Sequence, residues 1–169
     1  MEGDWETTNS ASFIGWVPTP PEHIEGFFEL VTPTSEDVVF DLGSGDGRLL
    51  FAALEKGAGR VVGVELDSQL VKTARDTARS KGLEARAKFI EGDVRSADLR
   101  EATAVFCYLC TEASMTLKPK LESQLKPGTK VVMETFSVPG WKPTKTAQIG
   151  WKEFYLYVMP PEREGIQPV

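Results

Sequence analysis

The stretch Val38-Val-Phe-Asp-Leu-Gly-Ser-Gly-Asp-Gly-Arg48 runs from a mostly apolar segment directly into three glycines at alternate positions. The apolar segment is typical of a buried strand, and the apolar residues after Arg48 predict a helix to about Glu55. Glycines let the backbone turn tightly and approach a ligand closely. In open α/β sheets, ligands bind outside the carboxyl ends of the strands, at such a turn. The stretch therefore predicts a ligand site in an α/β domain.

Strand-like and helix-like segments alternate through the rest of the chain. Ser68 begins a helical pattern that ends near Gly82, and a later helix is expected to be interrupted at Pro119. Further strands are expected at residues 61–65, 87–90, 104–109 and 130–136. Such alternation predicts a doubly wound α/β fold, in which helices cover both faces of five parallel strands.

The C-terminal part departs from this alternation. Residues 145–149 and 152–158 are both strand-like, and only Gly150-Trp151 separates them. They must pair antiparallel, because a parallel connection needs a dozen or more residues. The sheet is therefore expected to end in an antiparallel hairpin. A single domain is then expected at residues 16–159, with a flexible tail at 1–15 and a polar tail at 160–169.

The segment before the first strand contains Trp16-Val-Pro-Thr-Pro20, which prolines hold extended. Thr19 is expected to cap a following helix, with Glu22 completing a capping box. Gly26 weakens the helical pattern.

The composition restricts the class of partner. The 169 residues carry 19 basic and 25 acidic side chains, a net charge of −6. This balance disfavours a nucleic acid as the main partner and suits a basic one, such as a lysine-bearing protein surface. The first ten residues do not resemble a secretory signal, so a cytoplasmic location is expected.

Two features that could indicate metal or redox chemistry have simpler interpretations. Cys107 and Cys110 lie in an apolar run, where positions three apart face opposite sides of a strand. No second cysteine pair accompanies them, so they are interpreted as small buried hydrophobic residues rather than metal ligands. His23, the single histidine, lies between acidic residues and is expected to be solvated.

Acidic residues follow three successive strands. Asp41 precedes the glycine loop and Asp46 lies within it, where both would repel a pyrophosphate but attract ammonium and sulfonium groups. Glu65 follows the first glycine by 22 residues, a spacing suited to binding ribose hydroxyls. Asp93 ends the third strand, within reach of an adenine amino group. Together these residues predict a site for an adenosyl cofactor without phosphates, and the glycine spacing disfavours a nicotinamide-dependent oxidoreductase.

Asp41-Leu-Gly-Ser-Gly-Asp-Gly47, Glu65, Asp93 and the terminal hairpin resemble the class I, seven-stranded methyltransferases, which have a Rossmann-like fold and use S-adenosyl-L-methionine. The resemblance covers about residues 36–158. It implies that Asp41 and the loop residues hold the methionine part, that Glu65 binds the ribose, and that Asp93 and Val94 border the adenine. The loop residues are Gly43, Ser44, Gly45, Asp46 and Gly47. Leu66 and Leu109 belong to the same expected cofactor-binding set.

A narrower resemblance is to the archaeal broad-specificity protein lysine methyltransferase and its mitochondrial relatives. In that family the proline segment before the core helps to close the cofactor site, which implies cofactor contacts for Trp16, Pro18 and Thr19. The family usually has Tyr or Phe at the position of Trp16. The similarity rests on Trp16-Val-Pro-Thr-Pro20, Gly45-Asp-Gly-Arg48, Leu117-Lys-Pro-Lys-Leu-Glu122, Leu125-Lys-Pro-Gly128 and Phe136 with Gly140-Trp141.

The end of the fourth strand gives an indication of the methyl acceptor. Enzymes that methylate exocyclic amines of nucleic acid bases commonly carry Asn/Asp-Pro-Pro-aromatic there, whereas this chain has Phe106-Cys-Tyr-Leu-Cys110. Tyr108 is therefore the expected acceptor contact. Trp16, Phe136 and Trp141 either line the same mouth or pack in the core. Glu134 either binds a lysine ammonium or lies solvated at an edge.

These observations predict a methyltransferase acting on lysine amines of proteins. An amine needs no dedicated base, because desolvation lowers the pKa of a lysine, and aromatic faces stabilise methylated ammonium groups. A small-molecule methyltransferase and a non-catalytic, cofactor-binding accessory subunit are the alternatives.

Overall fold

The structure, a computed structural model, describes residues 19–165. Helices and strands alternate as far as the fifth strand, and strands joined without helices follow. In chain order the elements are α1 (Pro21–Leu30), β1 (Val38–Leu42), α2 (Arg48–Glu55), β2 (Arg60–Glu65), α3 (Ser68–Ser80), β3 (Ala87–Glu91), the 3₁₀ helix η1 (Val94–Ser96), β4 (Ala104–Cys107), α4 (Thr111–Gln124), β5 (Lys130–Glu134), β6 (Trp141–Lys142), β7 (Lys145–Ile149), β8 (Lys152–Val158) and β9 (Glu162–Arg163).

Seven strands form one sheet in the order β3-β2-β1-β4-β5-β8-β7. The first five strands of the chain are parallel, whereas β8 pairs antiparallel with both β5 and β7. The short strands β6 and β9 form a separate antiparallel pair. The predicted doubly wound sheet and its terminal hairpin are confirmed. The strand order reverses between β1 and β4, which places the glycine loop after β1 at the topological switch point.

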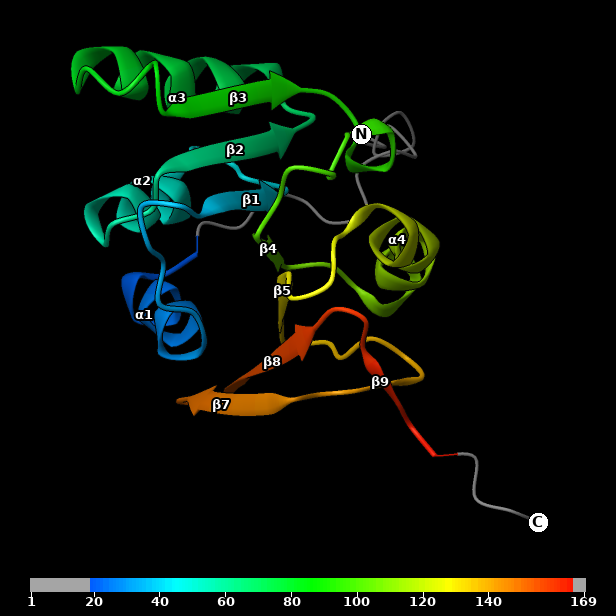
Figure 1. Ribbon diagram of the computed structural model, residues 1–169. Helices are drawn as coiled ribbons and strands as arrows, with labels where there is room; N and C mark the ends of the chain where they lie inside the picture. The colour runs from blue at the N-terminus through cyan, green and yellow to red at the C-terminus, as the bar shows by residue number, and fades with distance from the viewer. Residues whose placement is uncertain (1–18, 166–169) are drawn as a thin grey trace, which may run out of the picture.

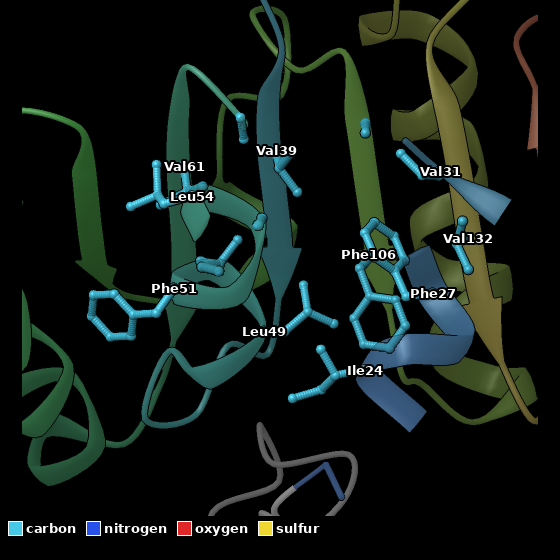
Figure 2. Close-up of a cluster of buried hydrophobic side chains, with 14 of the residues drawn as sticks. Ile24, Phe27, Val31, Val39, Leu49, Phe51, Leu54, Val61, Phe106 and Val132 are labelled. Atoms are coloured by element: carbon cyan, nitrogen blue, oxygen red, sulfur yellow. The ribbon is translucent and has the colours of Figure 1, made fainter. Parts of the chain in front are cut away.

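Each face of the sheet has its own hydrophobic core. Residues of α1, α2 and α3 cover one face, where they pack on Val39, Phe106 and Val132. Residues of α4 cover the other face, as Figure 1 shows. Figure 2 shows the first core, in which the rings of Phe27 and Phe106 meet edge to face with centroids 5.2 Å apart. Because both faces are buried, the central strands are mostly apolar rather than alternating, and the acids Asp41 and Glu134 are buried within β1 and β5.

Helix α1 lies close to the terminal hairpin because Gly26 has no side chain. A Cβ atom at Gly26 would lie 2.8 Å from the side chains of both Ile149 and Phe154. The helical pattern therefore has a glycine where the helix approaches β7 and β8. The predicted cap of this helix is wrong: Pro20 is the N-cap residue, and no side chain caps the helix. Pro21 has no N–H group, so the first turn has one donor fewer to satisfy.

The expected interruption of a helix at Pro119 is also wrong, since α4 is continuous from Thr111 to Gln124. Pro119 removes one hydrogen bond, to the carbonyl of Met115, and Met115 is exposed, so water can satisfy that carbonyl. Leu117 and Leu121 anchor the helix on the sheet on either side of the proline.

Two parallel strands end earlier than expected. β4 ends at Cys107, and β5 ends at Glu134, where Thr135 has a φ of 70°. Cys110 consequently precedes α4 instead of continuing the strand, and both cysteines contact the core on the α4 face. The expectation that they face opposite sides is therefore wrong, although Cys107 is buried and both thiols are free.

Within residues 19–165, no helix combines the length and apolar character needed to cross a bilayer. The same described range contains no group of His, Cys, Asp and Glu side chains arranged to hold a metal ion.

Candidate functional site

The glycine loop joins β1 to α2 and is tied to the end of β2. The backbone N–H groups of Gly43 and Ser44 both donate to the carbonyl of Val64, at 2.8 and 3.1 Å. Gly43 has a φ of 90°, and a Cβ atom added there would meet nothing within 4 Å. The loop therefore has a backbone conformation that favours glycine, with open space beside it. The Oγ atom of Ser44 is buried without a hydrogen-bond partner among the described residues.

Glu65 lies at the end of β2 and supports the loop. Its Oε1 atom accepts a hydrogen bond from the N–H of Gly45 at 3.0 Å, and its Oε2 atom accepts one from the N–H of Asp67 at 2.9 Å. The side chain is only partly buried, and each oxygen retains a further lone pair. Glu65 can thus accept hydrogen bonds from a ligand while it holds the loop.

Asp41 is the most buried acid of the loop region, with 5% of its surface exposed. Burial, together with the nearby charges of Glu65, Glu134 and Asp46, raises the pKa of Asp41 to about 8. Among the hydrogen bonds and ion pairs of residues 19–165, none involves its carboxyl group. A cation bound beside Asp41 would favour its charged form.

Asp46 behaves differently from Asp41. Its carboxylate pairs with the guanidinium of Arg48, with Nη2 and Oδ2 2.7 Å apart, and this contact lowers the pKa of Asp46. The expectation that both acids face a cationic ligand is therefore supported only for Asp41, because Arg48 offsets the charge of Asp46.

The third strand brings Asp93 to the same edge of the sheet. Asp93 caps η1 by accepting a hydrogen bond from the N–H of Arg95, and the Arg95 guanidinium lowers the pKa of Asp93. The N–H of Gly92 donates to the carbonyl of Glu65, which joins the ends of β2 and β3. Val94 is partly buried beside it.

The remaining predicted cofactor residues differ in their surroundings. Leu66 follows Glu65 and is 41% exposed, whereas Leu109 is buried just before α4. Thr19 is partly buried immediately before α1. Trp16 and Pro18 lie outside the described residues. The structure thus brings Asp41, Glu65 and Asp93 together with the loop at one edge of the sheet.

The end of β5 carries a charged cluster of which the sequence analysis related only Glu134 to the acceptor, and the alternative that Glu134 lies solvated at an edge is wrong. Glu134 at the end of β5 is fully buried, and Lys152 of β8 places its Nζ atom 2.5 Å from Oε1 of Glu134. The same Nζ atom lies 4.6 Å from the centroid of the Tyr108 ring. Nδ1 of His23 lies 3.7 Å from Oε1 of Glu134, so the expectation of a solvated histidine is wrong. Helix α1 packs against β7 and β8, and this buries His23 against Phe154.

The two-residue period of β8 indicates that Lys152 faces inward, a signal that is missed when residues 145–158 are interpreted only as a hairpin. Phe154 and Leu156 face the α1 side of the sheet, and the two-residue period of a strand places Lys152 on that side as well. A lysine at an inward position is the signal that could have found it.

The aromatic mouth predicted at the acceptor side is only partly present. Trp141 is fully buried on the α4 face, packs against Tyr157 and donates a hydrogen bond from Nε1 to Glu122 at 2.8 Å. It is a core residue, because hydrogen bonds with Lys118 and Glu122 hold the segment from Pro139 to Trp141 against α4. Phe136 is partly buried after the end of β5. Tyr108, the expected acceptor contact, is partly buried against the core of the α1 face, with the Lys152 ammonium over its ring.

This arrangement fits an adenosyl cofactor with an amino-acid end. Open space lies at Gly43, and neither the carboxyl of Asp41 nor the hydroxyl of Ser44 has a hydrogen-bond partner among residues 19–165. Both groups can accept hydrogen bonds from a positively charged ligand. A pyrophosphate would meet the same buried acid, which disfavours a dinucleotide.

Comparison with known proteins agrees with this geometry. Residues 41–145 match the model of the ANTKMT methyltransferase domain. The chain belongs to this methyltransferase family. A protein-lysine N-methyltransferase from Saccharolobus islandicus is 36% identical over 151 residues, which span 86% of this chain and 94% of the relative.

A relative from mouse, Mus musculus, carries a similar domain within a longer chain. This protein, the adenine nucleotide translocase lysine N-methyltransferase, is 33% identical over 144 residues. The match spans 85% of this chain but 62% of the mouse protein.

Among solved structures, an RNA methyltransferase from Salinibacter ruber in complex with S-adenosyl-L-homocysteine superimposes with a TM-score of 0.82. It is 38% identical, and the match covers 88% of this methyltransferase and 97% of that chain.

Proposed function

We propose that this methyltransferase transfers a methyl group from S-adenosyl-L-methionine to lysine side-chain amines of proteins. The observation that carries the proposal is the acceptor side of the sheet, where the ring of Tyr108 lies 4.6 Å from a lysine ammonium, that of Lys152. An aromatic face attracts a cation and tolerates its methylated forms. The 36% identity to the Saccharolobus protein-lysine enzyme, over nearly its whole length, supports the same acceptor class.

On the cofactor side, we assign the methionine part to Asp41 and the glycine loop of residues 43–47. The burial of the Asp41 carboxyl at the start of the loop supports its assignment to the α-ammonium group. Glu65 is assigned to the ribose hydroxyls. Asp93, Val94, Leu66 and Leu109 are assigned to the surroundings of the adenine, and Trp16, Pro18 and Thr19 to the segment that closes the site.

When bound, the cofactor supplies an electrophilic methyl group on a sulfonium centre. The protein's own contribution is to align an amine with it, and alignment alone can supply about 7–11 kcal/mol. Tyr108 and the buried surface around it limit water at the acceptor side, which favours the neutral amine. No residue is assigned the role of general base.

RNA is a second candidate acceptor, because the Salinibacter structure is described as that of an RNA methyltransferase. The net charge of −6 favours protein instead, as does the lack of an Asn/Asp-Pro-Pro-aromatic pattern at residues 106–110. A small-molecule acceptor and an accessory, non-catalytic role are the remaining alternatives. We propose a cytoplasmic location, which cell fractionation tests.

Label transfer from methyl-tritiated S-adenosyl-L-methionine into a cell extract tests the acceptor class. The wild-type protein is compared with Asp41→Asn, which should lose transfer, and with Asp98→Asn, an exposed control expected to retain it. Label recovered on lysine after protein hydrolysis supports the proposal. Label only in RNA or in small molecules contradicts the protein acceptor. S-adenosyl-L-homocysteine binding without any label transfer supports the accessory role.

A further inference from the structure

The cluster of Glu134 and Lys152 has the chemistry of a binding site for a lysine side chain. Glu134 is fully buried and Lys152 is 7% exposed, and they form an ion pair at 2.5 Å. The ammonium of Lys152 also lies over two rings, 4.6 Å from that of Tyr108 and 5.4 Å from that of Trp151. A buried carboxylate with aromatic faces around one ammonium group is what an acceptor lysine would require.

The position of the cluster relative to the cofactor loop is set by strand register. Asp41 pairs with Phe106 in β4, and Phe106 pairs with Val132 in β5. Glu134 therefore lies two residues closer to the carboxyl edge than Val132, on the same face as Val132. The charge of Glu134 also contributes to the raised pKa of Asp41. The cluster thus adjoins the part of the site assigned to the methionine end.

The cluster lacks hydrogen bonds that a purely structural ion pair would need. Among the described residues, the buried Oε2 atom of Glu134 has no partner, and neither do Nδ1 of His23 and Oγ1 of Thr135. A buried ion pair stabilises a fold only when its remaining lone pairs are also satisfied. Thr135 has a φ of 70°, a left-handed conformation that costs free energy in a β-branched residue, and residues strained in this way cluster at functional sites.

The position of Lys152 allows its side chain to rotate away from Glu134 toward solvent. It is the first residue of β8, directly after the Gly150-Trp151 turn, and Trp151 is 78% exposed. The side chain lies near the tip of the hairpin and not between the central strands, so rotation toward solvent would not break the sheet.

We propose that Glu134 binds the acceptor lysine in its ammonium form, and that Lys152 occupies this position until the acceptor displaces it. The bound ammonium loses its proton to water before methyl transfer, because only the neutral amine is nucleophilic. The inference rests on the proposed lysine acceptor. It makes Glu134 a specificity-determining residue and Lys152 an internal competitor. Substitutions of Glu134 or Lys152 should therefore change acceptor binding without changing the cofactor loop.

The test measures binding of a short capped peptide with a single lysine to the full chain saturated with S-adenosyl-L-homocysteine, by calorimetry. The same peptide with norleucine in place of lysine reports binding that does not depend on the ammonium. Lys152→Met should bind the lysine peptide about tenfold more tightly than the wild type, because the competitor is gone. Lys145→Met, an exposed position on β7, is the matched control and should not change the affinity.

Glu134→Gln alone leaves a buried, unpaired Lys152 and can unfold the protein, so the informative variant is the double one. Glu134→Gln with Lys152→Met removes both charges and should bind the lysine peptide at least about tenfold more weakly than Lys152→Met alone. S-adenosyl-L-homocysteine affinity and the melting temperature verify that each variant is folded.

Equal affinities of Lys152→Met and the double variant would overturn the inference, as would equal affinities of Lys152→Met and the wild type. Methyl label found on Lys152 of the wild type by mass spectrometry would support it, because Nζ would then occupy the acceptor position. If the wild-type protein transfers label only to RNA or small molecules, the proposed function fails and the inference falls with it. If it methylates lysine but the variants do not differ, the inference fails alone.

Discussion

The carboxylate of Glu65 accepts a hydrogen bond from the backbone N–H of Gly45, 3.0 Å away, and so joins the end of β2 to the loop after β1. The contact orients an acidic side chain beside a glycine-rich turn at the switch point of the sheet. The same carboxylate also accepts from the N–H of Asp67, which begins the turn into α3. Its position is therefore fixed by two backbone contacts before any ligand binds.

Glu65→Ala should weaken S-adenosyl-L-homocysteine binding about tenfold to a hundredfold, because hydrogen bonds to a charged group contribute about 1.5–3 kcal/mol. Calorimetric titration measures this. Glu101→Ala, an exposed acid at the opposite edge of the sheet, serves as the control. Unchanged affinity in a folded Glu65→Ala protein would remove the ribose assignment.

Gly43→Ala tests the close approach of a ligand to the loop, and the chain contains a matched control. Gly43 and Gly128 both have a φ of 90°, and a Cβ atom at either would meet nothing within 4 Å. Alanine at either position should cost a similar backbone strain, of about 1–2 kcal/mol. Only Gly43→Ala should also weaken cofactor binding, because its methyl group would occupy the open space that we assign to the cofactor. Comparable cofactor affinities in the two variants would contradict this placement.

Asp41 makes the stability of the cofactor-free protein depend on pH. Its pKa is raised to about 8 in the folded state from 3.8, so between these values the folded protein holds a proton that the unfolded chain has lost. The contribution of protonated Asp41 to stability is fully present below its pKa in the unfolded chain. It is lost as the pH rises through its pKa in the folded protein. The free energy of unfolding should fall by up to about 1.4 kcal/mol per pH unit in this window.

Urea unfolding at several pH values measures that slope, and Asp41→Asn should reduce it. Asp98→Asn should keep it, since Asp98 is exposed and pairs with Arg100. A slope that survives in Asp41→Asn would show that another group carries the proton.

Trp141→Phe distinguishes a core residue from an acceptor contact. The substitution removes the hydrogen bond from Nε1 to Glu122 and part of a fully buried ring, and should destabilise the protein by about 1–3 kcal/mol. The acceptor affinity of the folded variant should equal that of the wild type. Thermal unfolding measures the loss of stability, and peptide titration measures the acceptor affinity. A loss of acceptor affinity without a loss of stability would show that Trp141 contacts the acceptor.

Local patterns in the chain were sufficient to predict the fold. The stretch of residues 38–48, the alternation of strands with helices and the two-residue link at Gly150-Trp151 each act over a short length of chain. Strand period, helix period and turn chemistry are properties of neighbouring residues, so they can be recognised without the structure. The same holds for the acids that follow each strand, because parallel strands place their carboxyl ends at one edge. The pairing of Asp46 with Arg48, two residues away, is also local and was overlooked.

The contacts that buried side chains make across the fold could not be predicted from such local patterns. Trp141 turned out to donate a hydrogen bond to Glu122 of α4, and Glu134 to meet both His23 and Lys152. The last contact joins α1, β5 and β8, elements far apart in the chain, and depends on sheet order, on strand register and on the glycine that lets α1 approach the hairpin. Burial and charge pairing arise only when such elements pack together, and no local period in the sequence contains them.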